Sequence, residues 1–158
     1  MVHKRKIGHL LLIRYKHDPV AFLIRTHTRG YWNHVAWIWR GSALIESKGL
    51  GVMISKIDKY NNPKKFKTKV LKIKKLSIKE QIKMEDFLVK SCTKKLPYIN
   101  QIITFLLVFL NFKGPLPKYT CSGLIAGAFN SIGRSFCSKQ PSLTTPEDIN
   151  RSKETKNA

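Results

Sequence analysis

Short apolar runs in the first half of the chain predict β-strands. Residues 7–15 are rich in Leu and Ile and are followed by a Lys-His-Asp-Pro sequence at 16–19, which is typical of a strand followed by a turn. Two further runs, 31–39 and 43–47, flank the short polar step 40–42 and therefore predict a hairpin. Residues 21–28 fit either a strand or a short helix, and their periodicity does not decide between the two.

Two more strands are expected after this hairpin. Gly49 and Gly51 bracket a turn into the apolar run 52–57. Residues 67–74 alternate lysine with apolar side chains, apart from one slip at 70–71. Because one face of such a strand is charged, the pattern favours an edge strand with that face in water.

Helical patterns dominate the second half. Ser77 and Glu80 have the spacing of a capping box, so a helix is predicted from there to about residue 94. Residues 99–112 predict a mostly buried helix. In the helix that begins after Ser77, the residues at helical spacing are Ile78, Ile82, Glu85, Leu88 and Val89.

The last part of the chain predicts two more helices and a tail. One helix begins at Cys121 and closes near Gly133, and a shorter one begins with Thr145 as N-cap and Pro146 in its first turn. Residues 151–158 are polar, so we expect a frayed tail. The order of elements predicts a single domain over residues 1–158 of the α+β class, with an antiparallel sheet and a helical half.

The composition limits the possible classes of protein. A chain of 158 residues with 42% hydrophobic content is long enough to bury its own core. Its three cysteines form no even disulfide framework, which favours reduced thiols and a cytoplasmic or similarly reducing compartment. The apolar stretches 7–13 and 102–110 are too short for a signal peptide and for a membrane span, respectively.

The net charge of +21 is large for one domain. A dense block of lysines in the range 56–83 would attract a nucleic acid or an anionic membrane through salt-sensitive forces. A solvated lysine-rich face is the alternative interpretation, and the sequence leaves both open. The block consists of Lys56, Lys59, Lys64, Lys65, Lys67, Lys69, Lys72, Lys74, Lys75, Lys79 and Lys83.

Three residues carry the candidate chemistry, and each has a suitable local setting. Cys121 opens a predicted helix, where the helix dipole and a nearby imidazolium lower the pKa of a thiol. His34 and Glu46 lie in the two strands of the predicted hairpin. We therefore expect Cys121 as nucleophile, His34 as base and Glu46 as the acid that orients the imidazole ring.

The length of the hairpin loop tests this arrangement. A loop of the three residues 40–42 places His34 opposite Lys48 and Glu46 opposite Ala36. Glu46 is then the diagonal neighbour of His34 on the same face of the sheet, within reach of a long side chain. A two-residue loop without a bulge would place the two side chains on opposite faces.

The ordered set of motifs resembles the permuted papain-like cysteine hydrolases of the NlpC-type superfamily, which are related to lecithin retinol acyltransferase. The resemblance covers about residues 7–152, and it implies a circularly permuted papain-like fold with a sheet or small barrel against a helical half. It also implies that Tyr98 lines the site, near the oxyanion; a packed tyrosine that caps a helix is the alternative interpretation of this residue. The family usually has Asp where this chain has His9, and Glu where it has Gly123. The matching segments are 7–12, 33–38, 44–47, 96–100, 119–125 and 144–149.

These features predict a cysteine-dependent hydrolase, an amidase, peptidase or acyl-ester hydrolase or transferase, that acts through a thioester on Cys121. The alternative is a basic binding or structural protein on the same scaffold, with an idle triad. No cofactor is expected, and zinc is not expected because the remaining histidines lack ligand spacing. Cys92 is expected to be a small buried side chain, and Cys137 has neither a helix start nor a base nearby. Two of the three tryptophans, Trp32, Trp37 and Trp39, are expected to pack on the sheet face opposite His34.

Overall fold

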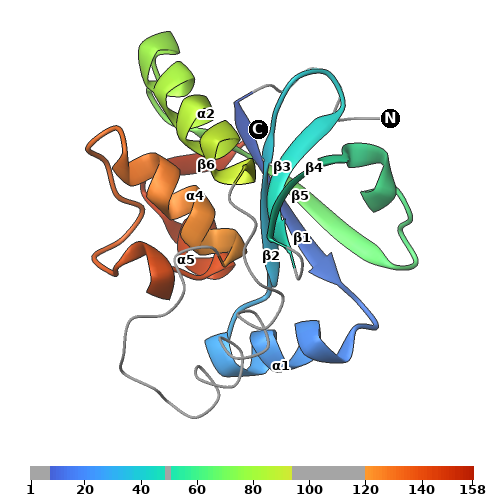
Figure 1. Cartoon of the computed structure of the whole chain (residues 1–158). Helices are drawn as coiled ribbons and strands as arrows, with labels where there is room; N and C mark the ends of the chain where they lie inside the picture. The colour runs from blue at the N-terminus through green and yellow to red at the C-terminus, as the bar shows by residue number, and fades with distance from the viewer. Residues whose placement is uncertain (1–7, 49–50, 94–119) are drawn as a thin grey trace.

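The computed structural model describes residues 8–48, 51–93 and 120–158, and its central feature is an open six-stranded antiparallel sheet (Figure 1). The strand order is β4-β3-β2-β1-β5-β6. This arrangement confirms the α+β class. The strands are β1 (His9–Tyr15), β2 (His34–Ile38), β3 (Ala43–Lys48), β4 (Gly51–Lys56), β5 (Phe66–Ile73) and β6 (Thr155–Asn157).

The helices α2, α4 and α5 gather on one side of the sheet, and α1 lies beyond one end of it (Figure 1). The larger hydrophobic core fills the space between the sheet and these helices, where Trp37 of β2 packs with Leu88 of α2 and Phe129 of α4. A smaller core, which includes Leu11, lies on the other face of the sheet against the 3₁₀ helix η1. The helices are α1 (Pro19–Thr28), η1 (Ile57–Tyr60), α2 (Ile78–Cys92), α4 (Cys121–Asn130), η2 (Pro141–Leu143) and α5 (Pro146–Arg151).

The undecided range 21–28 belongs to helix α1. The Asp18 side chain caps it by accepting a hydrogen bond from the backbone N–H of Ala21 at 2.7 Å. Pro19 occupies the first turn, where its missing N–H costs nothing. The capping residues therefore identify this segment as a helix, which the hydrophobic periodicity alone did not distinguish from a strand.

The hairpin forms in the predicted register. Trp37 pairs with Ile45 and Ile38 pairs with Leu44, which is the pairing that a loop of residues 40–42 requires. His34 therefore faces the same side of the sheet as Glu46, while Trp37 points into the larger core on the opposite side. The prediction for the tryptophans is confirmed, because Trp32 and Trp37 are buried in that core and Trp39 packs against it.

The predictions for β5 and for the C-terminal tail were wrong in a related way. β5 is not the edge strand of the sheet, because Leu71–Ile73 pair with β6 on the side opposite β1. β6 comes from the segment expected to fray, and its Thr155 is buried and donates a hydrogen bond from Oγ1 to the Ile149 carbonyl at 2.9 Å. A polar strand of three residues has no hydrophobic alternation, so tertiary pairing alone reveals it.

Helix α2 begins as predicted, but only part of the predicted apolar spacing is buried. Ser77 and Glu80 form the capping box. Met84 and Leu88 are fully buried, whereas Ile78 is 78% exposed and Ile82 is 62% exposed. The packed face of the helix therefore includes Leu88 of the predicted positions but not Ile78 and Ile82.

The two helices near the C-terminus begin where the sequence predicts. Cys121 is the first residue of α4, and Thr145 caps α5 with Asp148 completing a second capping box. The predicted helix 99–112 lies outside the described residues. Within residues 8–48, 51–93 and 120–158, none of the helices has the length and apolar character needed to cross a bilayer.

Candidate active site

Cys121 owes its position to the start of helix α4. The Thr120 side chain caps the helix by accepting a hydrogen bond from the backbone N–H of Gly123 at 3.0 Å. Cys121 is therefore the first helical residue, at the positive end of the helix dipole. It is half-buried and packs against the edge of the larger core.

His34 and Glu46 meet across the β2–β3 hairpin. The His34 Nε2 atom lies 2.7 Å from Oε2 of Glu46. His34 is 7% exposed and Glu46 is fully buried. The His34 side chain also forms a hydrogen bond with the Cys121 side chain. Because Glu46 occupies Nε2, the nitrogen that remains for the sulfur is Nδ1.

The three candidate residues therefore form one chain of contacts from a carboxylate through an imidazole to a thiol. β2 and β3 supply the base and the acid on one face, and α4 brings the thiol from the other end of the sequence. An ordered acid, base and nucleophile of this kind is the arrangement that nucleophilic catalysis requires.

The charges of the site favour a thiolate and an imidazolium. Burial raises the pKa of the Cys121 thiol, but the His34 charge, its hydrogen bond and the backbone N–H groups of Val35 and Ser122 together bring this pKa below its ordinary value. Burial lowers the pKa of the His34 ring, yet the charge and hydrogen bond of Cys121 and the contact with Glu46 raise this pKa from 6.5 to about 9. The two shifts have a common cause, since each charge stabilises the other.

Glu46 stays ionised despite its burial. Burial alone would raise the pKa of this carboxyl, but hydrogen bonds from His34, Lys59 and Ser55 and the His34 charge hold the pKa well below 4.5. Oε2 also accepts a hydrogen bond from the Tyr60 hydroxyl at 2.7 Å. The carboxylate thus has a fixed position and a fixed charge beside the imidazole.

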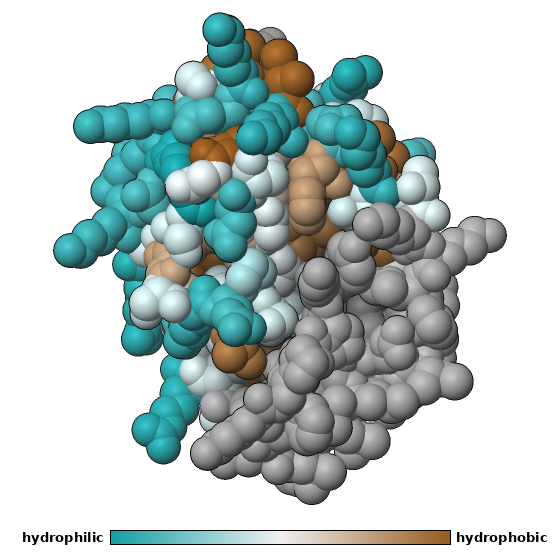
Figure 2. Space-filling view, turned by 60° about the vertical axis from the view of Figure 1, so that its left-hand side comes forward, coloured by the Kyte–Doolittle hydropathy of each residue, from teal (hydrophilic) through white to brown (hydrophobic). Residues whose placement is uncertain are grey.

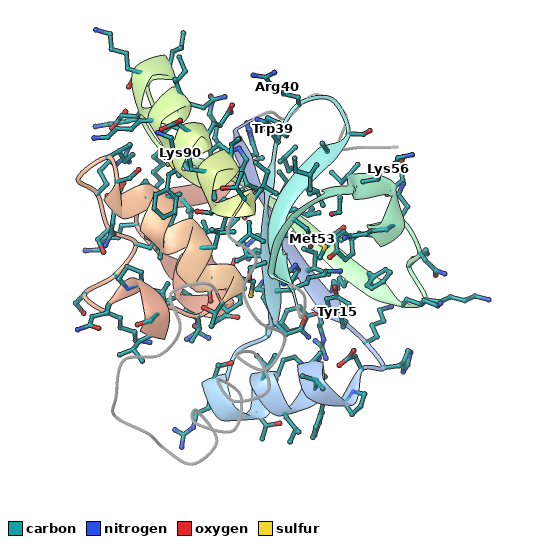
Figure 3. All side chains as sticks on the ribbon, in the orientation of Figure 1. Tyr15, Trp39, Arg40, Met53, Lys56 and Lys90 are labelled. Carbon is teal, nitrogen blue, oxygen red and sulfur yellow. The ribbon has the colours of Figure 1, made fainter. Side chains whose placement is uncertain are left out.

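Two tyrosines extend the site away from the sulfur. The Tyr15 and Tyr60 hydroxyls are 3.0 Å apart, and the Tyr15 ring packs edge-on against the His34 ring. Tyr15 lies at the end of β1 that faces α1 (Figure 3). Burial, with the nearby Glu46 charge, raises the pKa of Tyr60 far above 10, so its hydroxyl remains a donor throughout the ordinary pH range.

Sequence reasoning missed the groups on the far side of Glu46, namely Ser55, Lys59 and Tyr60. One signal was available for Ser55, because β4 pairs with β3 and places Ser55 opposite Leu44, diagonal to Glu46 on the same face. Lys59 and Tyr60 reach the site because η1 turns back under the sheet, which no periodicity in the sequence indicates.

Three further residues singled out in the sequence are Tyr98, Cys92 and Cys137. Tyr98 lies outside the described residues. Cys92 ends α2, is half-buried and hydrogen-bonds through its sulfur to the Leu88 carbonyl at 3.4 Å, and burial raises the pKa of its thiol. Cys137 lies 3.8 Å from the Thr144 hydroxyl. All three cysteines are free.

No group of three His, Cys, Asp or Glu side chains suited to a metal ion occurs among residues 8–48, 51–93 and 120–158.

Comparison with known proteins finds a similar fold among solved structures but no related sequence. No family model matches the sequence, and no curated protein matches it. Among solved structures, the chain is similar to the crystal structure of the metalloprotein yiiX (DUF1105) from Escherichia coli O157:H7, with a TM-score of 0.68 and 10% sequence identity. The match covers 98% of this chain and 97% of that protein. At this identity the likeness concerns the fold alone.

Proposed function

We propose that the protein is a cysteine-dependent hydrolase or acyltransferase of the permuted papain-like, NlpC-type class. The observation that carries the proposal is the chain of contacts from Glu46 through His34 to Cys121, with the thiol at the first residue of a helix. Its order along the sequence, base and acid before nucleophile, agrees with the permuted arrangement that the motifs resemble.

The proposed reaction uses these three side chains in two steps. The Cys121 thiolate attacks the acyl carbon of an amide or ester and forms a thioester, while the leaving group departs with a proton from the His34 imidazolium. His34 then takes a proton from water, which attacks the thioester and releases the carboxylic acid and the thiolate. Glu46 keeps the imidazole oriented and stabilises its charged form, and the backbone N–H of Cys121 is a donor for the developing oxyanion.

A thiol-labelling experiment tests the nucleophile. Iodoacetamide should alkylate Cys121 at about pH 6, where an ordinary thiol with a pKa near 8.5 is almost entirely protonated. Peptide mass spectrometry separates this label from any label on Cys92. Burial raises the pKa of the Cys92 thiol, so Cys92 is the internal control.

Two variants sharpen the test. Cys121→Ala should remove the rapid label, and His34→Gln should slow the labelling of Cys121 by about tenfold or more at pH 6, because the thiolate loses its counterion. Equal labelling rates for Cys121 and Cys92 in the folded wild-type protein would overturn the proposal.

A second role, docking on a phosphate-bearing surface, is favoured by the exposure of the lysine block. Ten of its eleven lysines are exposed and Lys69 is half-buried, so most of these charges face solvent. Outside the grey atoms, hydrophilic residues cover most of the face in Figure 2, with separate hydrophobic patches between them. The surface would bring the enzyme to a nucleic acid or an anionic membrane through long-range attraction.

This second role is tested with two variants that each lose four positive charges, one within the lysine block and one outside it. Substituting Lys64, Lys65, Lys72 and Lys74 by Gln should weaken binding to heparin, RNA or anionic vesicles at low salt more than the control does. The control replaces four exposed basic residues outside the block, Arg29, Arg40, Lys90 and Lys139, by Gln. Equal binding by the two variants would show that net charge alone acts, and the docking surface would be rejected.

A further inference from the structure

The Glu46 carboxylate accepts more hydrogen bonds than it needs in order to orient His34. Oε2 receives the His34 Nε2–H and the Tyr60 hydroxyl, each at 2.7 Å. Oε1 receives the Ser55 hydroxyl and the Lys59 ammonium. One carboxylate oxygen thus serves the base, while the other is bound to a cation that faces away from the reaction.

We propose that Lys59 is a positioning residue that fixes Glu46 and offsets part of its negative charge, so that the carboxylate binds the imidazolium of His34 less strongly than it would alone. The consequence for catalysis rests on the proposed function, whereas the effect on His34 does not.

The fold holds Lys59 in this position. Lys59 belongs to η1, and the backbone N–H of Ile57 in the same turn donates to the Ser42 carbonyl at 2.8 Å, which ties η1 to the β2–β3 hairpin. The adjacent Tyr60 is buried and bonds to the same carboxylate. The Lys59 Nζ atom lies 4.9 Å from the centre of the Tyr60 ring, and the side chain remains 32% exposed. An ammonium held this way is partly hydrated and needs little desolvation.

The resulting charges alternate along the site as Lys59 positive, Glu46 negative, His34 positive and Cys121 negative. A general acid and base works best when its pKa lies near the working pH. A buried carboxylate with no cation behind it would hold the proton on the imidazole too firmly for transfer to the leaving group. Lys59 therefore makes His34 a better proton donor while keeping its partner in place.

The effect must be separated from those of the other groups around the pair. A second cation, Lys48, lies farther away, with Nζ 4.0 Å from Oε1. The ionisable and polar groups facing His34 and Glu46 come from β1, β3, β4, η1 and α4, and they are Tyr15, Lys48, Ser55, Lys59, Tyr60 and Cys121. Because Lys59 contributes a full charge in direct contact, its removal should have a larger electrostatic effect than removal of a neutral donor.

The test is a direct titration of His34 by NMR from about pH 6 to about pH 10.5, in wild type and in Lys59→Met. The His34 signal is assigned by its loss in His34→Gln. The expected result is a rise in the His34 pKa of about one unit, because the carboxylate charge is no longer offset. An unchanged pKa, or a fall caused by the carboxylate leaving the ring, would overturn the proposal.

Three further variants complete the experiment. Lys59→Arg keeps the charge and should restore the wild-type value, and Lys64→Met removes one exposed charge elsewhere and should leave it unchanged. Ser55→Ala removes a neutral donor from the same oxygen and should shift the pKa less than Lys59→Met. The titration reads the ring itself, so a His34 response to Lys59 without any rapid labelling of Cys121 would leave this inference standing and reject the hydrolase.

Discussion

At the scale of single residues, Glu46 is a buried carboxylate that accepts hydrogen bonds from several side chains. It is fully buried, and its negative charge is maintained by donors from three different elements, β2, β4 and η1. A buried carboxylate is stable only when its lone pairs are satisfied, so the groups around Glu46 stabilise the fold as well as orient His34.

Replacing Glu46 by Gln should therefore lower the free energy of unfolding by about 3 kcal/mol at pH 6. The pKa of Glu46 is lowered in the folded protein, so the unfolded chain binds more protons at acid pH. The stabilisation is present above about pH 4.5 and is lost as the pH falls toward the folded pKa. Urea unfolding at about pH 3 to 5, where the unfolded His34 is almost fully protonated, should show the difference between wild type and Glu46→Gln shrinking as the pH falls.

The matched control is Glu85→Gln on helix α2, a half-buried carboxyl that accepts a hydrogen bond from Gln81. This substitution should lower the free energy of unfolding at pH 6 much less than Glu46→Gln does. A constant difference between wild type and Glu46→Gln over the whole acid range would contradict the assignment of an ionised, stabilised carboxylate.

At the scale of elements, the N-terminus of α4 couples helix capping to the chemistry of the thiol. Thr120→Ala removes the side-chain acceptor for the Gly123 N–H and should cost about 1 kcal/mol of stability. Fraying of the first turn would also weaken the dipole at Cys121, so alkylation of this thiol at about pH 6 should slow. Unfolding by urea and the labelling rate measure the two effects separately.

Helix α5 offers the control, because Thr145 caps it in the same manner through the Asp148 N–H at 3.1 Å. Thr145→Ala should cost a similar amount of stability without changing the labelling of Cys121. If both variants slowed the labelling equally, general destabilisation would explain the result and the local role of the α4 cap would be wrong.

Helix α2 permits a comparison between the face that the sequence suggested and the face that packs. Met84 is fully buried in the larger core, so Met84→Ala should lower the free energy of unfolding by about 2 to 4 kcal/mol. Ile82 is 62% exposed, so Ile82→Ala should change it by about 0.5 kcal/mol or less. Urea unfolding of the two variants decides between the faces, and a larger loss for Ile82→Ala would reverse the orientation described.

The elements that the sequence predicts well are those with strong local signals. The capping boxes at Ser77 and Thr145 locate two helix starts, and the polar step 40–42 sets the hairpin register that unites His34 with Glu46. β6 and the packed face of α2 depend on contacts made by distant segments, so local pattern could not supply them. The same holds within the site, where the triad follows from residue type and spacing, while Lys59 enters only through the turn of η1.

At the scale of the whole molecule, the net charge of +21 opposes compactness. Repulsion among the exposed lysines is unscreened at low ionic strength, where the Debye length is about 30 Å at 0.01 M salt, and is largely screened at about 0.15 M. Added sodium chloride should therefore raise the unfolding temperature between these two concentrations, by about 3 °C for each kcal/mol of repulsion removed. Thermal unfolding followed by circular dichroism measures the shift.

The variant that lacks the charges of Lys64, Lys65, Lys72 and Lys74 separates general repulsion from a specific anion site. With four positive charges fewer, its unfolding temperature should be higher at low salt and should rise less as salt is added. Sodium phosphate at equal ionic strength should act like chloride if screening alone is responsible, whereas an extra stabilisation by phosphate that the variant loses would indicate anions bound at the lysine block. An unfolding temperature that falls with added chloride would show that attractive ion pairs outweigh the repulsion, and the prediction would be rejected.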